Sequence, residues 1–325
     1  MRISRQVQLA RHPVGAIRRE DFEIVEVELP EPSDGELLVE SLLISVDPYM
    51  RLRMRDPAFR GRNFGGNGIG RVLVSRHPAF ADGELVRHTS GFCERFLTDG
   101  TSLSKLDHPS GLPLEVQLSA LGGIGLCAYG GLLEIGRLRE GEQVFVSAAA
   151  GAVGSLAAQI ARIRNCHVVG STGSKPKAGW LRSMGIETIN YKAGDLVDAL
   201  GQAMPAGIDV YFDNVGGRHL DAALAHINLD GRIPVCGMIS AYDSDASPVE
   251  TLHRIVIKRV LMKGFHLTEL DHVRDRFRQE MTDWLLSGAI QTQQSVFDGI
   301  AAVPDALMAI FDGSSTGKTM VRIGD

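Results

Sequence analysis

The sequence feature with the clearest chemical use is the small-residue turn AAAGAVG at 148–154, between the apolar runs 144–146 and 155–161. A strand, a tight turn and a helix in this order direct free backbone N–H groups and the positive end of the helix dipole toward a phosphate. Glycine at 151 lets the backbone approach a pyrophosphate, and glycine at 154 lets the helix pack closely on the strand. Although alanine replaces the first glycine of the usual pattern, the turn predicts a dinucleotide site. A turn that only packs a helix on a sheet is the alternative.

The segment after the next predicted strand indicates which dinucleotide is preferred. An NAD site usually carries Asp or Glu about 20 residues after the glycines, where the acid bonds the ribose 2′-hydroxyl. Here the segment STGSKPK at 171–177 contains no acid. Its hydroxyls and lysines, above all Ser174 and Lys177, would suit a 2′-phosphate. The segment therefore favours NADPH, and a solvated helix start with two surface lysines is the alternative.

Two halves with different patterns surround these features. Residues 1 to about 120 show short apolar runs broken by Pro, Gly and Asp, which predict a β-rich domain; the runs are 22–29, 36–46, 70–75 and 84–87. From 121 onward, strand-like runs alternate with helical stretches, which predicts an α/β domain with a doubly wound parallel sheet. The strands are expected at 143–147, 166–171, 208–213, 233–236 and 260–265, and the helices at 153–164, 175–184, 194–204, 218–228, 249–259 and 273–286.

Composition excludes several classes of protein. The 325 residues are 44% apolar and 22% charged, which is typical of a globular chain. A net charge of −5 gives no positive field that would favour nucleic acid or an anionic membrane. The first residues contain no apolar signal segment, so we expect a cytoplasmic protein. The four cysteines are widely spaced, which argues against both a structural zinc site and a disulfide framework.

Six motifs in order carry a family resemblance: SVDPYMR at 45–51, the turn at 148–154, FDNVGG at 212–217, CGMIS at 236–240, MKGF at 262–265 and GKT at 317–319. With them the chain resembles zinc-free medium-chain dehydrogenases/reductases. The branch is that of prostaglandin reductases, leukotriene hydroxydehydrogenases, curcumin reductases and plant alkenal double-bond reductases. The resemblance implies a Rossmann domain at 121–294 and a GroES-like substrate domain formed by 1–120 with 295–325.

The comparison with zinc-dependent relatives implies that no metal takes part. Those relatives carry a Cys-x-x-Asp-like segment and a Gly-His-Glu turn. This chain has VDP at 46–48 in the first place, and in the second Gly66 and Asn67 stand where histidine and glutamate would. Neither residue supplies the imidazole or carboxylate of a catalytic zinc site.

The resemblance also implies further contacts with NADPH. Lys177 and Tyr191 would flank the 2′-phosphate, and backbone at 265–267 would bind the carboxamide. Cys127 and Ser315 stand where relatives often have threonine and asparagine, which bond more strongly, so their cofactor roles are in doubt. The full set of expected cofactor residues is Gly151, Ala152, Val153, Gly154, Ser174, Lys177, Tyr191, Asn214, Cys236, Gly237, Ile239, Ser240, Tyr242, Phe265, His266, Leu267 and Ser315.

Without a metal, the expected chemistry is hydride addition to the β-carbon of a conjugated ketone or aldehyde, with a hydrogen-bond donor on the enolate oxygen. The candidate donors are Tyr49 and Tyr242, because phenols are protonated at neutral pH. The resemblance places Tyr49 in the substrate cleft and Tyr242 beside the cofactor. Either phenol could instead only pack, and a nicotinamide ribose hydroxyl could be the donor.

A basic cluster follows the first of these tyrosines and is interpreted as a solvated loop. Attraction of a carboxylate-bearing substrate is the alternative. The cluster consists of Arg51, Arg53, Arg55, Arg60 and Arg62.

Three functions are therefore weighed. We expect an NADPH-dependent reductase of small α,β-unsaturated aldehydes and ketones. The alternatives are an NADPH quinone reductase and a non-catalytic protein that only binds NADPH. By resemblance, two copies would pair through the strand near 260–266 to form a homodimer.

Overall fold

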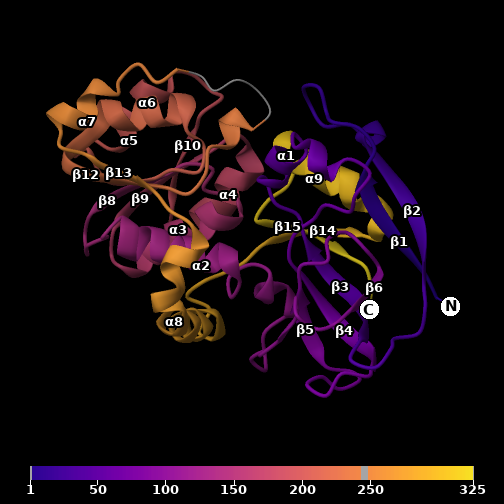
Figure 1. The fold of residues 1–325 in the computed structure, drawn as a ribbon. Helices are drawn as coiled ribbons and strands as arrows, with labels where there is room; N and C mark the ends of the chain where they lie inside the picture. Colours follow the sequence, from indigo (N-terminus) through magenta and orange to yellow (C-terminus); the bar gives the residue numbers. More distant parts are fainter. Residues whose placement is uncertain (1, 243–247, 325) are drawn as a thin grey trace. The chain divides into compact units, whose positions relative to one another are not determined.

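The computed structural model describes residues 2–242 and 248–324, and the chain divides into two compact units (Figure 1). Unit 1 comprises Met1–Ser110 with Gln294–Asp325, and unit 2 comprises Gly111–Gln293. The division comes about ten residues before the expected position, since Val116 and Ala120 pack in a core of unit 2. No helix in the described part of the chain is long and apolar enough to cross a membrane.

Unit 2 is built on a six-stranded parallel sheet with the strand order β10-β9-β8-β11-β12-β13. The chain runs outward from β8 to β10 and then crosses to the other side of β8. A crevice for a ligand is expected where the direction reverses, at the carboxyl ends of β8 and β11. The strands are β8 Gln143–Val146, β9 His167–Thr172, β10 Glu187–Asn190, β11 Ile208–Phe212, β12 Ile227–Val235 and β13 Leu261–Gly264.

Helices cover both faces of this sheet. Val144 and Val146 of β8 pack in the core cluster that contains residues of α2, α3, α4 and α8, whereas Phe145 packs in the cluster with α5 and α6. This alternation is expected of a strand that is buried on both faces. The helices are α2 Gly123–Gly130, α3 Ala152–Ile163, α4 Lys175–Ser183, α5 Leu196–Ala203, α6 Gly217–His226, α7 His253–Ile257 and α8 Arg274–Leu286.

The expected α/β architecture is confirmed, and four elements of unit 2 differ from the prediction. Strand β10 was missed, because no strand was expected between the helices at 175–184 and 194–204. Helix α7 is only five residues long where 249–259 was expected, and β12 begins at Ile227 within the helix expected at 218–228. Helix α2 was not predicted because its glycines have low helix propensity. Those glycines instead let neighbouring side chains pack close to the helix backbone. A side chain on Gly130, for example, would place its Cβ only 2.6 Å from the Leu270 side chain.

Unit 1 contains a seven-stranded sheet with the order β14-β15-β3-β4-β5-β7, in which β6 also pairs with β3, and a separate pair β1-β2. Among the strands described in unit 1, β14 and β15 pair in parallel and the other pairs are antiparallel. The predicted β-rich half is therefore confirmed. Its elements are β1 Arg2–Leu9, β2 Phe22–Leu29, β3 Leu37–Ser45, α1 Met50–Arg53, β4 Gly68–Ser75, β5 Leu85–His88, β6 Arg95–Thr98, β7 Ser104–Lys105, β14 Gln294–Asp298, α9 Val303–Phe311 and β15 Lys318–Arg322.

Candidate active site

The glycine turn lies at the carboxyl end of β8 and leads into α3, whose first residue is Ala152. A Cβ on Gly154 would lie 2.4 Å from the carbonyl oxygen of Ala148, so only glycine allows this packing of the helix on the turn. A Cβ on Gly151 would meet only that same oxygen, at 3.1 Å, and otherwise open space. No side chain of the described residues caps α3. Its first N–H groups therefore suit a phosphate group in this open space.

The residues expected at the 2′-phosphate follow the carboxyl ends of β9 and β10. Ser174 precedes α4, Lys177 lies in its first turn, and both are half-buried. Tyr191 follows β10, and its hydroxyl lies beside the end of β9. A Cβ on Gly173, the residue after β9, would be 2.9 Å from this hydroxyl oxygen. The Tyr191 ring packs edge-on against the buried His219, with centroids 5.0 Å apart. The fold thus brings Tyr191 next to the segment that contains Ser174.

A buried carboxylate, Asp213, organises the carboxyl ends of β8 and β11. Oδ1 of Asp213 accepts hydrogen bonds from the Tyr211 hydroxyl (2.6 Å) and from the N–H groups of Val215 (2.9 Å) and Gly216 (2.8 Å). The side chain of Asn214 donates to the Ser147 carbonyl oxygen at 2.7 Å, which ties the two strand ends together. Burial raises the pKa of Asp213 despite these donors. The network shapes the loop that contains Asn214.

The expected cofactor loop at 236–242 packs on this same strand end. The N–H of Cys236 donates to the Asp213 carbonyl oxygen at 2.8 Å, and the N–H of Ile239 donates to that of Asn214 at 3.2 Å. The Tyr242 hydroxyl turns back to its own loop, where it accepts from the N–H of Met238 at 3.3 Å. This geometry supports a role for Tyr242 in holding the loop.

Two thiols meet in unit 2. A hydrogen bond with Cys127 of α2, together with burial, raises the pKa of Cys236 well above that of a free thiol. Cys127 therefore bonds the loop at 236–242. Both cysteines are free thiols.

The segment expected at the carboxamide follows β13. The N–H of His266 donates to Oε1 of Glu269 at 3.1 Å, so this N–H is already used within the chain. The Leu267 side chain packs on α2, since a Cβ on Gly123 would lie 3.0 Å from it. The Phe265 side chain packs on the residues after α2, since a Cβ on Gly131 would lie 2.6 Å from it. The peptide groups of Phe265 and Leu267 are the better candidates for contact with the carboxamide.

In unit 1, a buried ion pair holds the turn that leads to Tyr49. The ammonium group of Lys318 donates to Oδ1 of Asp47 at 3.0 Å and to the carbonyl oxygen of Val46 at 2.7 Å. The Ser45 hydroxyl donates to the other carboxylate oxygen of Asp47. Lys318 is only 1% exposed, and burial lowers its pKa. A buried charge pair with its hydrogen bonds satisfied allows little movement of this turn.

Tyr49 directly precedes α1 and is 36% exposed. Burial and the charge of Asp47 raise the pKa of its phenol to about 12, against an opposite effect of Arg53. The hydroxyl therefore stays protonated throughout the neutral range and can donate a hydrogen bond. Ser315 also lies in unit 1, half-buried, and its N–H donates to the Ala309 carbonyl oxygen at 3.0 Å.

Both units are similar to known oxidoreductases. Residues 5–106 match the family described as the N-terminal domain of oxidoreductase, and residues 152–287 match the family described as zinc-binding dehydrogenase. Prostaglandin reductase 1 of Bos taurus is 39% identical over 97% of this chain and 97% of its own. The 2-alkenal reductase (NADP(+)-dependent) of Nicotiana tabacum is 38% identical over 98% and 97%. The structure of CurA from Vibrio vulnificus in complex with NADPH is 35% identical, covers 99% of both chains and gives a TM-score of 0.91.

The chain belongs to the medium-chain dehydrogenase/reductase family. Within it the chain falls in the branch of the prostaglandin, alkenal and curcumin reductases. Quinone oxidoreductase structures at 20–22% identity share the fold alone.

One of the two family descriptions mentions zinc. In this medium-chain reductase, no group of three or more His, Cys, Asp or Glu side chains among the described residues is arranged to hold a metal ion. Gly66 and Asn67 have the wrong chemistry for zinc ligands. That turnover needs no metal stays a prediction.

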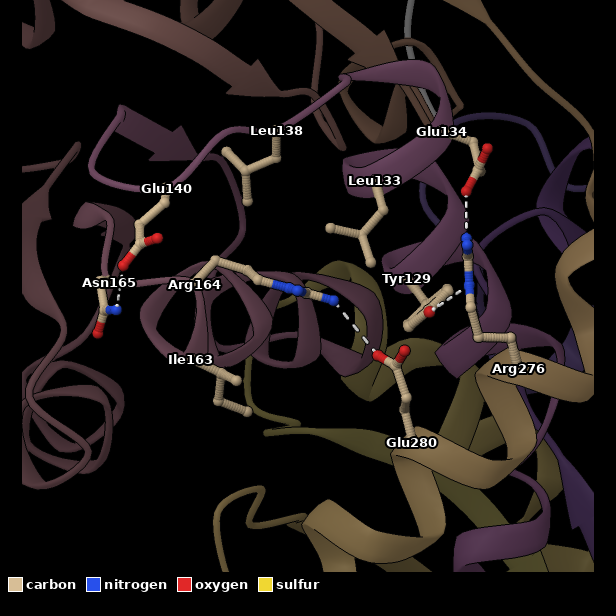
Figure 2. A pocket seen from close by; sticks show the side chains of 10 residues that line it. All are labelled: Tyr129, Leu133, Glu134, Leu138, Glu140, Ile163, Arg164, Asn165, Arg276 and Glu280. Carbon is tan, nitrogen blue, oxygen red and sulfur yellow. Dashed lines mark hydrogen bonds and ion pairs between the residues drawn. The ribbon is translucent and has the colours of Figure 1, made fainter.

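A pocket of about 570 Å³ lies elsewhere in unit 2 (Figure 2). It is next to the carboxyl end of α3, whereas the glycine turn is at the amino end of that helix. Its charged groups bond one another: Arg164 with Glu280 at 3.3 Å, and Arg276 with Glu134 (Figure 2). We assign no ligand to it.

Two buried residues, one in each unit, lie next to predicted site residues and had no predicted role of their own. Asp213 could have been suspected from its place between a buried strand and the NVGG turn. Lys318 belongs to the GKT motif, but its ion pair with Asp47 was not predicted, because the two residues are 271 positions apart. Interpretation of the arginine cluster as a solvated loop was wrong for Arg51, which is 2% exposed, and for Arg53, which packs on Tyr49.

Proposed function

We propose that this chain is an ene-reductase, which reduces the carbon–carbon double bond of α,β-unsaturated aldehydes and ketones without zinc. The coarser statement, that it is an NADPH-dependent oxidoreductase, rests on relatives named for that activity. Bound NADPH supplies the hydride that reaches the β-carbon. A proton from solvent or from a nearby hydroxyl then completes the product at the α-carbon.

The observation that carries the proposal is the protonated Tyr49 phenol on a turn held by a buried ion pair. Negative charge develops on the substrate carbonyl oxygen as the double bond is reduced, and a phenol can stabilise it with a hydrogen bond. One such donor contributes ~3–4 kcal/mol, and correct orientation of the reactants ~7–11 kcal/mol. Together these effects can drive the reaction without a strong acid.

The cofactor residues are proposed from their places at the carboxyl edge of the parallel sheet. The first N–H groups of α3 would bind the pyrophosphate, and the hydroxyls and ammonium group near the ends of β9 and β10 would bind the 2′-phosphate. The proposed set is Gly151–Gly154, Ser174, Lys177, Tyr191, Asn214, residues 236–242 and the backbone at 265–267.

The test supplies NADPH and, one at a time, enones and enals of graded length and a quinone. Turnover is measured as the loss of NADPH absorbance at ~340 nm. We expect turnover with the conjugated carbonyls and products heavier by two hydrogen atoms. Turnover of the quinone alone would favour a quinone reductase. Binding of NADPH with no turnover of any substrate would favour a non-catalytic protein.

We also propose that two copies pair through β13, the edge strand of the parallel sheet. Exposed apolar side chains at and beside this edge support pairing: Val256 is 81% exposed, Ile257 65% and Leu261 42%. An uncovered apolar edge strand is a usual site of pairing with another chain. Val256→Glu with Ile257→Glu should convert a dimer to a monomer in light scattering, whereas exposed Leu286→Glu should not. A monomeric parent chain would contradict the proposal.

We place the protein in the cytoplasm. All four cysteines are free thiols, which fits a reducing compartment.

A further inference from the structure

We propose that Arg53 and Gly66 position the Tyr49 hydroxyl, Arg53 by stacking on the phenol ring and Gly66 by leaving free the space beside the oxygen. The inference rests on the proposed function, in which Tyr49 is the hydrogen-bond donor. It assigns two positioning residues that do not themselves need to touch the substrate. All three residues lie in unit 1.

The first contact is between Arg53 and the face of the phenol. Arg53 ends α1, four positions after Tyr49, so the two side chains lie on the same side of this short helix. The guanidinium carbon lies 5.0 Å from the centre of the Tyr49 ring. One guanidinium nitrogen donates to the Gly65 carbonyl oxygen at 2.7 Å. Because the planar group is bonded at one end and stacked on the ring, it restricts rotation of the ring.

The second contact concerns the oxygen itself. A Cβ on Gly66 would lie 3.0 Å from the Tyr49 hydroxyl oxygen and 2.7 Å from Cε of Met50. The methionine end is flexible and can move away. The phenol, held by the Arg53 stack, could make room only by tilting. Any side chain at position 66 would therefore displace the hydroxyl.

This arrangement gives a physical meaning to the departure from zinc-dependent relatives. Gly66 stands where the resemblance places a histidine of the Gly-His-Glu turn. An imidazole at 66 would crowd the Tyr49 hydroxyl in its present place, because a single added carbon atom would already lie 3.0 Å from the oxygen.

The kinetic test is a double-mutant cycle. Gly66→Ala should lower kcat for an enone by ~10-fold or more when Tyr49 is present, and by less than ~2-fold in the Tyr49→Phe background, where no oxygen is displaced. Arg53→Gln should behave in the same way, and Arg53→Lys should recover part of the loss. The exposed Arg62→Gln is the matched control for removal of one charge. Equal losses with Tyr49 and with Phe at position 49 would overturn the inference.

A spectroscopic test does not depend on turnover. The chain has five tyrosines, and the other four, Tyr129, Tyr191, Tyr211 and Tyr242, lie in unit 2. In NMR spectra of protein with ¹³C-labelled tyrosine rings, the signal lost in Tyr49→Phe identifies Tyr49. Gly66→Ala and Arg53→Gln should shift that signal and leave the other four in place. An unmoved Tyr49 signal would overturn the positioning roles, whereas a shifted signal with no enone turnover would contradict only the proposed function.

Discussion

At the scale of single residues, the two candidate phenols are not equivalent. Tyr49 is partly exposed, and burial and Asp47 keep it protonated. The Tyr242 oxygen is bonded to its own loop through the N–H of Met238. We therefore propose Tyr49 as the donor. The bond from Met238 gives Tyr242 a role in holding its loop, although it leaves the Tyr242 proton available.

We expect Tyr49→Phe to lower kcat by no more than ~10³-fold, the usual cost of one oxyanion donor, and Tyr242→Phe by less than ~10-fold. With a folded pKa of about 12, Tyr49 should cause no loss of kcat/KM between pH 7 and about 10. Steady-state kinetics over this range measure both effects. A loss beyond ~10⁴-fold from either change would indicate proton transfer by that residue and contradict a mechanism dominated by orientation.

Cofactor preference also belongs to this scale. The double change Ser174→Asp and Lys177→Ala places an acid and removes a cation where the 2′-phosphate is expected. The KM for NADPH should rise well above that for NADH, because an acid repels the phosphate and can bond a 2′-hydroxyl instead. Measurement of both KM values for one enone tests this. A parallel rise of the two would contradict the placement of the 2′-phosphate.

At the scale of elements, the strand–turn–helix unit β8–α3 has two glycines with different demands. The Cβ absent from Gly154 would collide with backbone at 2.4 Å, whereas the Cβ absent from Gly151 would meet only the Ala148 carbonyl oxygen, at 3.1 Å. One glycine therefore serves packing, and the other leaves room for a ligand.

Gly151→Ala should leave the melting temperature within ~2 °C and weaken NADPH binding by ~10-fold or more. Gly154→Ala should lower the stability itself, by ~1–3 kcal/mol, since the helix must move away from the turn. Gly179→Ala, at a helical position with open space around it, is the control and should not destabilise the protein. Thermal melts and fluorescence titration with NADPH separate these effects. Unchanged affinity in Gly151→Ala would place the pyrophosphate elsewhere.

At the scale of the whole molecule, each unit contains one histidine buried in neutral form. Burial lowers the pKa of His88 in unit 1 to about 4, and burial with the charge of Arg218 does the same for His219 in unit 2. Both folded pKa values lie below the unfolded value of ~6.5, so the unfolded chain binds more protons between these limits. The contribution of these two neutral histidines to the free energy of unfolding is therefore fully present above pH ~6.5 and is lost as the pH falls toward 4.

The expected loss is on the order of 3 kcal/mol for each histidine, a large share of the stability of a typical domain. Denaturant unfolding at pH 7 and pH 4.5 measures it. His219→Phe keeps an aromatic ring against Tyr191 and should reduce the pH dependence, whereas the same change at exposed His253 should not. Equal pH dependence in the His219→Phe variant and the parent would contradict a neutral buried His219.

The sequence by itself determined the nucleotide half of the molecule. A run of alternating strands and helices, a glycine turn and an acid-free segment are local patterns, and they are read from residues that are neighbours in the chain. Such patterns predicted the parallel sheet, although the short strand β10 and the glycine-rich helix α2 were missed. Only the tertiary structure decided what surrounds Tyr49. Lys318 reaches Asp47 from the far end of the chain, and Gly66 adjoins the phenol because β4 pairs with β3. These contacts depend on which distant segments pack together, and periodicity carries no information about that.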